Sequence, residues 1–334
     1  MRRSMALKLS LRASLVQGPF PEWFAQPPGA DNIPLDREDR MLVDLHVHST
    51  ASDGEHTPAE LVEISNRKGL SVLGMCDHDT MGGLPGAAKA AGPLGVRLVL
   101  GIELSIDLRD GGTSHLLGYF PHSSPRELVD PQNELQKALA MVQDGRRERN
   151  RKILVRLSSL GVGLSPGSIE RIESKPVLGR PHIAKAMLRE GLVSSEKEAF
   201  ERYLARERPA YFERKRLSVD RSIGVIRSQN GLPVLAHPGL LGKSHRELRA
   251  LVESLVDDGL AGLEVYYPTH SAELRDFLLT MCEELDLMVT GGTDYHGNRM
   301  SSVPLGGEES GFHVDAKDVE RFLAACGLTL PGKG

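Results

Sequence analysis

Short apolar runs, each followed by polar residues, recur along this chain of 334 residues. They are short enough to be buried strands rather than helices, and they lie at 41–45, 70–76, 96–102, 113–119, 232–236, 262–266 and 287–293. Several are followed by a helical pattern, at 57–68, 244–258 and 271–285. Pro58 falls in the first turn of the first of these helices, where proline is favoured. Alternating strands and helices predict an α/β fold built as a parallel barrel.

Residues of the types that bind metals gather where these runs end. His46 and His48 follow the first run, and both imidazoles should point to the same side because side chains alternate along a strand. Asp53 comes shortly afterwards. The later runs lead into or carry six more such residues: His78, Glu103, His115, His237, Asp294 and His296. Each alone has an ordinary structural explanation, but nine at strand ends predict a metal site at one mouth of the barrel.

The same residues resemble a known family. The stretches are 44–54 (DLHVHSTASDG), 76–80 (CDHDT), 101–103 (GIE), 237–238 (HP) and 292–296 (GTDYH). They occur in family order and resemble the PHP (polymerase and histidinol phosphatase) domain over about residues 41–300. Within that family the chain looks most like the nucleoside 3′,5′-bisphosphate phosphatases and 5′-to-3′ exoribonucleases. The resemblance implies a distorted seven-stranded barrel with three divalent metal ions at its mouth.

The resemblance also implies how the ligands divide among the ions. One ion would be held by His46, His48, Glu103 and Asp294. A second would share Glu103 and add His115 and His237, and the third would take Asp53, His78 and His296. Asp77 and Asp79 are expected either to orient imidazoles through hydrogen bonds or to cap a helix near Thr80. The mixture of nitrogen and oxygen donors favours Mn²⁺, with Zn²⁺, Fe²⁺ and Mg²⁺ as alternatives.

The strand–helix alternation stops between about residues 125 and 216, where the pattern becomes helical. One long helix is predicted over 133–160 and a further helix over 195–205, so this segment is expected to be a helical cap inserted into a barrel formed by 41–124 and 217–310. The cap holds 20 Lys and Arg against 13 Asp and Glu, whereas the rest of the chain holds 21 against 32. A basic cap over a barrel with this balance would attract an anionic substrate. Its five basic residues between 146 and 152 are expected to form only the solvated face of a helix.

Two residues of the cap are candidate substrate-binding residues. Arg180 and His182 lie beside Gly179 and Pro181, which favour a turn over a regular helix face. Arg180 is predicted to hold the phosphate that is not cleaved, because a guanidinium can bind phosphate with two hydrogen bonds. A histidine close to it can donate to a leaving oxygen. Three aromatic residues of the cap are candidates for stacking on a base: Tyr203, Tyr211 and Phe212.

The predicted site indicates hydrolysis of a phosphate ester. Several divalent ions together lower the pKa of a bridging water, produce a hydroxide nucleophile and clamp phosphoryl oxygens. His237, His296 and Asp294 are candidate catalytic residues, and either histidine could protonate the leaving group. The expected substrate is a nucleotide, with cleavage of the 3′-phosphate of a nucleoside 3′,5′-bisphosphate. A 5′-to-3′ exonuclease acting on short RNA or DNA would use the same residues and stays open.

Three other functions fit the residues less well. A histidinol-phosphate phosphatase is less favoured, because the subgroup motifs and the helical insertion fit the nucleotide branch better. An amidohydrolase usually places a modified lysine where Glu103 holds the bridging position. A non-catalytic PHP module, such as those fused to polymerases, often loses ligands that this chain keeps.

Composition limits the remaining possibilities. Three separated cysteines, Cys76, Cys282 and Cys326, argue for a reducing cytoplasm, and no apolar run approaches the ~20 residues of a membrane helix. No obligate protein partner is predicted. Residues 1–40 are expected to be a poorly ordered extension, with a transit peptide or a true start at Met41 as alternatives. The tail over 311–334 is expected to hold a final helix over 312–328.

Overall fold

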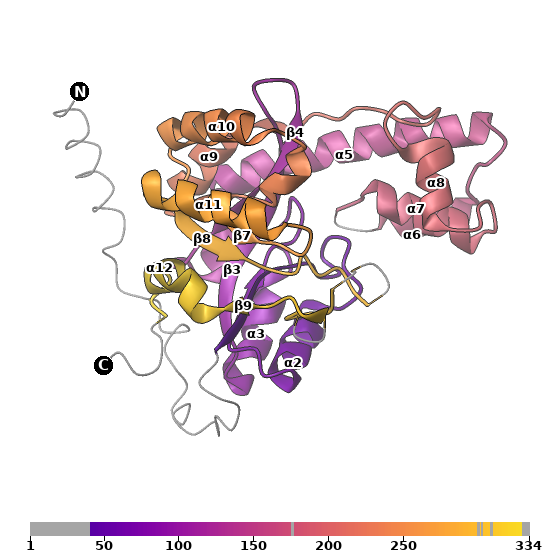
Figure 1. Cartoon of the computed structure of the whole chain (residues 1–334). Helices are drawn as coiled ribbons and strands as arrows, with labels where there is room; N and C mark the ends of the chain where they lie inside the picture. Colours follow the sequence, from indigo (N-terminus) through magenta and orange to yellow (C-terminus); the bar gives the residue numbers. More distant parts are fainter. Residues whose placement is uncertain (1–40, 175–176, 299–300, 302, 308–309, 329–334) are drawn as a thin grey trace.

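The computed structural model describes residues 41–174, 177–298, 301, 303–307 and 310–328, so the prediction for residues 1–40 lies outside the described residues. Its strands form one sheet that curves into a nearly closed barrel, with helices around it and a helical lobe on one side (Figure 1). No helix in the described part of the chain has the length and apolar character needed to cross a membrane.

The sheet has nine strands in the described part of the chain, and seven of them correspond to the predicted apolar runs; the other two are β9, described below, and the short β5 (Leu217–Ser218), which pairs with β3. In chain order the seven are β1 (Leu42–Val47), β2 (Val72–Met75), β3 (Arg97–Asp107), β4 (Thr113–Tyr119), β6 (Leu232–Leu235), β7 (Gly262–Tyr266) and β8 (Met288–Gly291). They are paired in the order β8-β7-β6-β4-β3-β2-β1. The two end strands meet just beyond β8, where the His48 backbone N–H donates to the Tyr295 carbonyl at 2.9 Å. This seam brings the first metal-ligand motif beside the last one.

One strand corrects the expectation of a parallel barrel. β4 runs antiparallel to both β3 and β6. No crossover helix separates β3 from β4; the chain returns through a tight turn in which the Leu108 N–H donates to the Gly112 carbonyl. A connection this short can join only antiparallel strands. The first residues of β4, including His115, therefore lie at the mouth where the parallel strands end.

Helices around the sheet begin where capping residues predict. They are α2 (Pro58–Arg67), α3 (Leu84–Leu94), α9 (Val219–Ser228), α10 (His245–Asp258) and α11 (Ala272–Glu284). Thr57 and Ser244 each form a capping box with a glutamate in the first turn, so the orphan N–H groups there are satisfied. Leu61, Leu255 and Leu278 are fully buried against the sheet. The packed helices thus hold the strands in place, and the candidate site lies at the ends of these strands.

The tail differs from the single helix expected over 312–328. It contains the short strand β9 (Val314–Asp315), a 3-10 turn (Ala316–Val319) and α12 (Glu320–Ala325). The edge of β1 offers unpaired backbone groups, and β9 pairs with it antiparallel. Phe322 of α12 then packs edge-on against Tyr119 inside the barrel, with ring centroids 4.8 Å apart. The tail therefore closes the barrel at the end where β1 starts.

The helical lobe is built on one long helix. The predicted helix over 133–160 is α5 (Glu134–Ser159), capped by Asn133, and it extends away from the barrel (Figure 1). Its far half packs with α6 (Pro166–Glu173), α7 (Arg180–Arg189), α8 (Glu196–Ala199) and a π-turn (Phe200–Leu204) around a separate apolar core. Leu135 and Leu139 of its near half belong to the barrel core instead. The division of the chain at residues 125 and 216 stays a prediction.

Candidate metal centre

The first histidine pair lies at the end of β1 with both rings fully buried. Their Nε2 atoms are 3.1 Å apart, because period-two alternation turns both side chains into the barrel mouth. Asp294, just beyond β8, places Oδ1 3.1 Å from His48 Nε2 and 3.5 Å from His46 Nε2. The Tyr267 hydroxyl donates to the other oxygen of Asp294 at 3.1 Å. Three side chains from the two sides of the seam thus converge on one point.

Glu103, in the middle of β3, is the hub of the cluster and is fully buried. Oε1 lies 2.9 Å from both His115 Nδ1 and His237 Nε2. Oε2 lies 2.7 Å from His78 Nδ1, and the His46 and His48 rings are 3.5 and 3.3 Å from it. One carboxylate thus faces two separate groups of imidazoles.

A third group lies on the other side of His48. Asp53 Oδ1 is 3.4 Å from His296 Nε2, and Asp53 Oδ2 is 3.9 Å from His78 Nε2. The His48 and His296 rings stack with centroids 4.0 Å apart. The structure therefore brings all nine predicted ligand residues together at one mouth, although their binding of metal stays a prediction.

The donor atoms suit divalent cations. Ligand atoms lie within 4.8 Å of one another in three overlapping groups: His46/His48/Glu103/Asp294, His48/Asp53/His78/His296 and His78/Glu103/His115. Five buried atoms of the cluster form no hydrogen bond of normal geometry with the described residues, even where another ligand atom lies close by: His48 Nδ1, Asp53 Oδ1, His78 Nδ1, Glu103 Oε2 and Asp294 Oδ1. Buried polar atoms are rarely left unpaired, and cations would satisfy these. The residues present thus fit a site for several metal ions.

Glu264, on β7, is a further residue of the centre that was not among the predicted site residues. It is fully buried, and its Oε1 lies 2.9 Å from His46 Nδ1, which holds the ring with Nε2 toward the mouth. Its Oε2 accepts the His237 backbone N–H at 2.7 Å. A carboxylate behind an imidazole ligand sets the ring's orientation and raises its basicity. The available signal was a charged residue inside an otherwise apolar strand.

Asp77 and Asp79 support loops and not imidazole rings, which corrects the expectation. Asp77 accepts hydrogen bonds from the Ser49 N–H, the Ser49 hydroxyl and the Ser52 hydroxyl, so it holds the loop that carries Asp53. Asp79 accepts from the Ser105 N–H at 2.8 Å and pairs with arginines of the lobe. Neither caps a helix, because α3 begins later, at Leu84.

Three residues at the mouth have a backbone conformation that is rare outside glycine. Asp79, His237 and Asp294 have φ values of 50°, 27° and 53°. Each such residue costs about 1–3 kcal/mol, and strain of this kind concentrates at functional sites. All three lie in the short segments that follow strands β2, β6 and β8, where the chain turns sharply at the mouth. The strain is therefore consistent with a site held in place by the surrounding strands.

The charges of the centre depend on one another. Burial disfavours ionisation of Glu103, but the neighbouring His115, His78 and His46 hold its pKa well below the ordinary value. Burial alone would lower the pKa of His46, yet Glu264, Asp294 and Glu103 raise it well above normal. His296 follows the same pattern, since Asp53 and Asp294 outweigh burial and raise its pKa to about 9. Without metal, protons therefore occupy sites that cations would take.

These shifts predict that the metal-free protein loses stability as pH rises. A histidine with a raised pKa in the folded state stabilises the fold below its unfolded pKa of about 6.5, and this contribution disappears as pH rises through the folded value. For His296 the loss falls between about pH 6.5 and 9. In EDTA, Tm should therefore fall over this range, and with Mn²⁺ the fall should be smaller because metal replaces the protons. Differential scanning fluorimetry at each pH measures both curves.

Two variants make this pH prediction specific. His296→Gln should flatten the slope in EDTA, whereas His245→Gln, on an exposed position of α10, should keep it. A metal-free Tm that is level or rises between pH 6.5 and 9 would contradict the expectation.

The two candidate substrate-binding residues lie in different places. His182 caps α7 by accepting the Gly179 N–H at Nδ1, and it lines a cavity of about 150 Å³ that also reaches Asp53. Arg180 lines another cavity, of about 290 Å³, and donates to the Leu204 carbonyl. The structure does not bring the two side chains into one pocket. Their substrate-binding role stays a prediction.

Two of the basic residues between 146 and 152 are not on a solvated face, which corrects the expectation for that run. Arg147, Arg151 and Lys152 are exposed, but Arg146 and Arg149 are only 7% and 5% exposed. Arg146 donates to Asp79 Oδ2 through Nε at 2.8 Å, so it ties α5 to the barrel mouth. Of the three aromatic candidates, Tyr203 is buried in the lobe core and Phe212 packs against it, whereas Tyr211 lines the cavity beside Arg180.

Comparison with known proteins agrees with this geometry. A family model described as the PHP domain matches residues 44–205. A 5′-3′ exoribonuclease of Haemophilus influenzae is 30% identical over 276 residues, covering 82% of this chain and 95% of that protein. A 3′,5′-nucleoside bisphosphate phosphatase of Chromobacterium violaceum is 29% identical over 260 residues, covering 76% and 87%. A solved structure from Bifidobacterium adolescentis, described as a metal-dependent phosphoesterase, has a TM-score of 0.72 at 29% identity and covers 85% and 96%.

Proposed function

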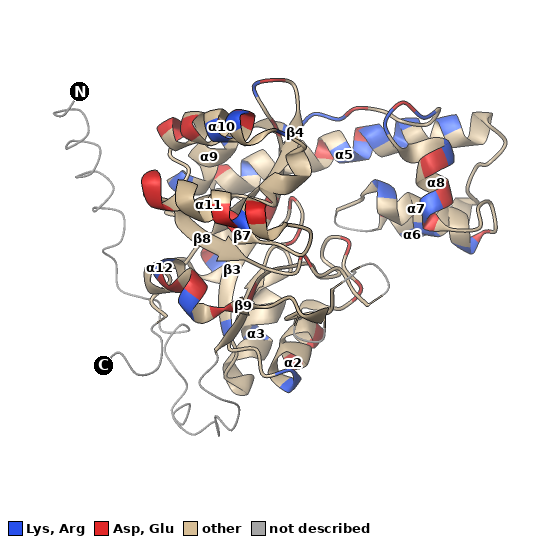
Figure 2. Cartoon of the chain, viewed as in Figure 1, with Lys and Arg blue, Asp and Glu red and all other residues tan. Residues whose placement is uncertain are grey.

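The chain belongs to the PHP domain family of metal-dependent phosphoester hydrolases, and from this membership we propose that it removes the 3′-phosphate of nucleoside 3′,5′-bisphosphates. The observation that carries the proposal is the convergence of the nine predicted ligand side chains, with unpaired buried polar atoms, at a mouth beside a basic lobe. Figure 2 shows Lys and Arg along α5 and α7, whereas Asp and Glu are frequent on the barrel helices α10 and α11. A small anionic substrate would be attracted between the two parts.

We assign the ligands to three ions by their contacts. His46, His48, Glu103 and Asp294 would hold the first. Glu103, His115 and His237 would hold the second, and Asp53, His78 and His296 the third. His48 and His78 each belong to two of the three groups of ligand atoms, so the three ion positions are adjacent to one another. Mixed imidazole and carboxylate donors favour Mn²⁺, Zn²⁺ or Fe²⁺ over Mg²⁺, and Mn²⁺ is our first choice.

Bound divalent ions supply an activated water and neutralise charge on the phosphoryl oxygens. The residues of this chain hold that arrangement rigid. Glu264 fixes the His46 ring and the His237 backbone, and Asp77 fixes the loop of Asp53. His296 lies beside Asp294, with Nδ1 3.5 Å from Oδ1, and His237 lies beside Glu103, with Nε2 2.9 Å from Oε1. We assign one of these two histidines to protonate the leaving oxygen.

Arg180 is the lobe residue that we assign to the phosphate that stays on the product. Arg180→Ala should raise KM for adenosine 3′,5′-bisphosphate by about 10–100-fold with a smaller change in kcat, because a hydrogen bond to a charged group contributes about 1.5–3 kcal/mol. The Mn²⁺-loaded enzyme is assayed by release of inorganic phosphate. Arg126→Ala, on an exposed position of α4 (Pro125–Leu128), serves as the matched control.

Two results would count against the proposal. An unchanged KM in Arg180→Ala would remove Arg180 from substrate binding. Failure of the wild-type enzyme to release phosphate from any nucleoside 3′,5′-bisphosphate would remove the proposed substrate itself.

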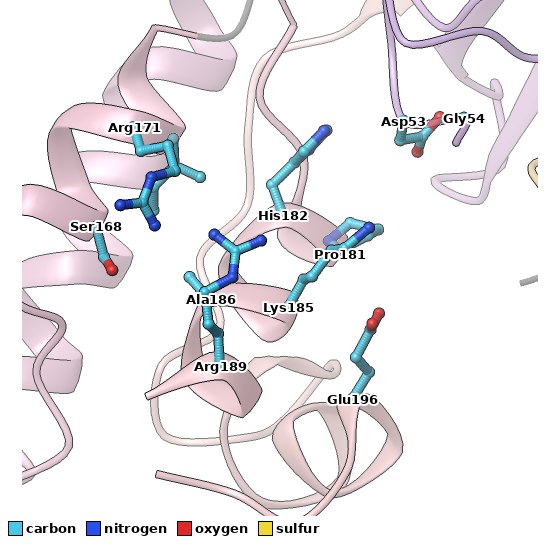
Figure 3. A pocket seen from close by; sticks show the side chains of 11 residues that line it. Asp53, Gly54, Ser168, Arg171, Pro181, His182, Lys185, Ala186, Arg189 and Glu196 are labelled. Atoms are coloured by element: carbon cyan, nitrogen blue, oxygen red, sulfur yellow. The ribbon is translucent and has the colours of Figure 1, made fainter. Parts of the chain in front are cut away.

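A second candidate function, 5′-to-3′ exonuclease, is favoured by the cavity beside Asp53. Arg171, Lys185 and Arg189 of the lobe project toward this cavity, and Asp53 and Gly54 form its barrel side (Figure 3). Its basic side chains would attract phosphates of a nucleotide strand beyond the one that is cleaved. Comparison of turnover of the bisphosphate and of 5′-phosphorylated dinucleotides separates the two functions.

A further inference from the structure

Of the seven strands that correspond to the predicted apolar runs, β7 is the one that supplies none of the nine proposed ligands. The four residues that follow it, 267–270, form a turn in which the His270 N–H donates to the Tyr267 carbonyl at 3.0 Å. Pro268 occupies the second position of this turn, where its fixed φ is favoured. Tyr267 and His270 are both buried, with exposures of 9% and 6%. Two buried polar side chains at the mouth therefore need a role other than binding an ion.

His270 anchors the 267–270 turn to the barrel. Its Nδ1 lies 2.9 Å from the Val265 carbonyl oxygen, which can only accept, so the proton is on Nδ1. Its Nε2 then accepts the Gly239 N–H at 3.1 Å. The contact is close, because a Cβ on Gly239 would come within 2.7 Å of His270 Cδ2. The turn and the segment that follows His237 are thus held against each other.

Tyr267 is held in place by this arrangement and reaches the metal centre. Its ring centroid lies 5.3 Å from that of His270 and 5.3 Å from that of His237. Its hydroxyl lies 3.1 Å from Asp294 Oδ2. A phenol keeps its proton at neutral pH, so the hydroxyl donates and the carboxylate oxygen accepts. Because the ring is packed between neighbours, the direction of this donor is fixed.

The two oxygens of Asp294 therefore have different surroundings. Oδ1 lies 3.1 Å from His48 Nε2 and 3.5 Å from His46 Nε2, and it is buried without a hydrogen bond of normal geometry among the described residues. Oδ2 accepts the Tyr267 hydroxyl instead. One oxygen is thus available to an ion, and coordination through both oxygens would break the hydrogen bond to Tyr267.

We propose that Tyr267 is a positioning residue that makes Asp294 a one-oxygen ligand and thereby sets a preference of the centre for Mn²⁺ over Ca²⁺. Ca²⁺ takes about six to eight oxygen ligands and often uses both oxygens of one carboxylate. A site rich in imidazoles, with one oxygen from Asp294, serves Ca²⁺ poorly. This role of Tyr267 rests on the proposed function for one point, that Asp294 binds an ion, and it is independent of the substrate.

The preference is measured by metal competition without any phosphoester. The metal-free full chain is loaded with Mn²⁺ and titrated with Ca²⁺, and electron paramagnetic resonance follows the free Mn²⁺ that is released. Tyr267→Phe keeps the ring and removes the hydroxyl, so Asp294 Oδ2 becomes free to turn toward an ion. The Ca²⁺ concentration that first displaces Mn²⁺ should fall by about 10–100-fold, the usual effect of losing a hydrogen-bond partner behind a metal ligand.

Tyr266→Phe is the matched control, because it removes the same hydroxyl one residue earlier in the chain. The charged neighbours of Tyr266 are Asp318, Arg275 and Asp276, and none of them is a proposed ligand. This variant should release Mn²⁺ at the same Ca²⁺ concentration as wild type. Thermal unfolding in EDTA shows whether each variant is folded and measures any purely structural effect of the substitution.

Three outcomes are distinguishable. An unchanged or higher Ca²⁺ concentration for Tyr267→Phe, with or without a lower Tm in EDTA, would mean that Tyr267 is only structural and would overturn the proposal. A wild type that binds no Mn²⁺ would overturn it together with the ligand assignment. If wild type binds Mn²⁺ and Tyr267→Phe shows the shift, but no nucleoside 3′,5′-bisphosphate is hydrolysed, the proposed substrate fails and the role of Tyr267 stands.

Discussion

Replacement of Glu103 by glutamine is expected to lower kcat/KM on any phosphoester by at least ~10³-fold, which corresponds to about 4 kcal/mol of lost transition-state stabilisation. Both oxygens of Glu103 face imidazoles of two different ligand groups, at 2.9 Å on one side and 2.7 Å on the other. Glutamine has the same shape but no charge, and its NH₂ group would point at ring nitrogens or at a cation. Two of the three proposed ion positions would be impaired at once.

Metal content shows whether the loss of activity has this cause. After loading with Mn²⁺ and removal of free metal, Glu103→Gln should retain fewer ions per chain than wild type, measured by plasma emission spectrometry. Glu63→Gln, on an exposed position of α2, should match wild type in both assays. Full metal content in Glu103→Gln, or activity above a tenth of wild type, would show that Glu103 does not bridge ions.

The convergence of the nine residues at one mouth could be predicted from sequence because each of them follows or interrupts an apolar strand. A strand end is a strong local signal, and the barrel fold places all parallel strand ends at one mouth. His115 was included although its strand runs antiparallel, and it lies at the mouth only because the hairpin turn reverses β4. The direction of β4 depends on the absence of a crossover helix, and the two glycines in the turn were the available signal.

The arginines of α5 show a different kind of limit. Val142, Arg146, Arg149 and Ile153 are spaced to lie on one face of the helix, so the buried stripe includes two cations. The charge of Arg146 and Arg149 predicts that both are exposed, whereas the helix periodicity predicts that both are buried. What decided the outcome was Asp79 on a distant loop, which accepts a hydrogen bond from Arg146. No local pattern in α5 contains that partner.

Asp44 and Glu264 were visible in sequence as single charged residues inside apolar strands, yet no role could be assigned to either. Both are fully buried. Their partners lie more than 200 residues away in the chain, at Thr293 for Asp44 and at His46 for Glu264. Long-range pairing of this kind depends on closure of the barrel. The roles of Asp44 and Glu264 can therefore be assigned only when the contact between β1 and β8 is known.

Asp44 is expected to be the residue whose loss destabilises the protein most. Its carboxylate accepts the Thr293 hydroxyl at 2.6 Å and the backbone N–H groups of Thr293 and Gly306, each at 3.0 Å, and the His46 N–H at 3.3 Å. The packing around it is tight, because a Cβ on Gly292 would come within 2.9 Å of Asp44 Oδ1. One side chain thus connects β1 to β8 and to the following loop.

Asp44→Ala should lower the free energy of unfolding by about 3–5 kcal/mol, because buried donors left without a partner cost about 1–3 kcal/mol each and the site relaxes only in part. Urea unfolding in EDTA measures the fold without the contribution of bound metal. Asp276→Ala, on an exposed position of α11, should change the free energy of unfolding by less than about 0.5 kcal/mol.

The same variant links the fold to the site. If the seam holds His46 and Asp294 in register, Asp44→Ala should also weaken Mn²⁺ binding at temperatures where the variant is still folded, although Asp44 itself lies behind the ligands. Asp44→Asn keeps the size and one acceptor oxygen, so it should fall between wild type and alanine in both stability and metal affinity. A loss of stability with unchanged metal affinity would mean that the ligands at the mouth are positioned by β2 and β3 without help from the seam.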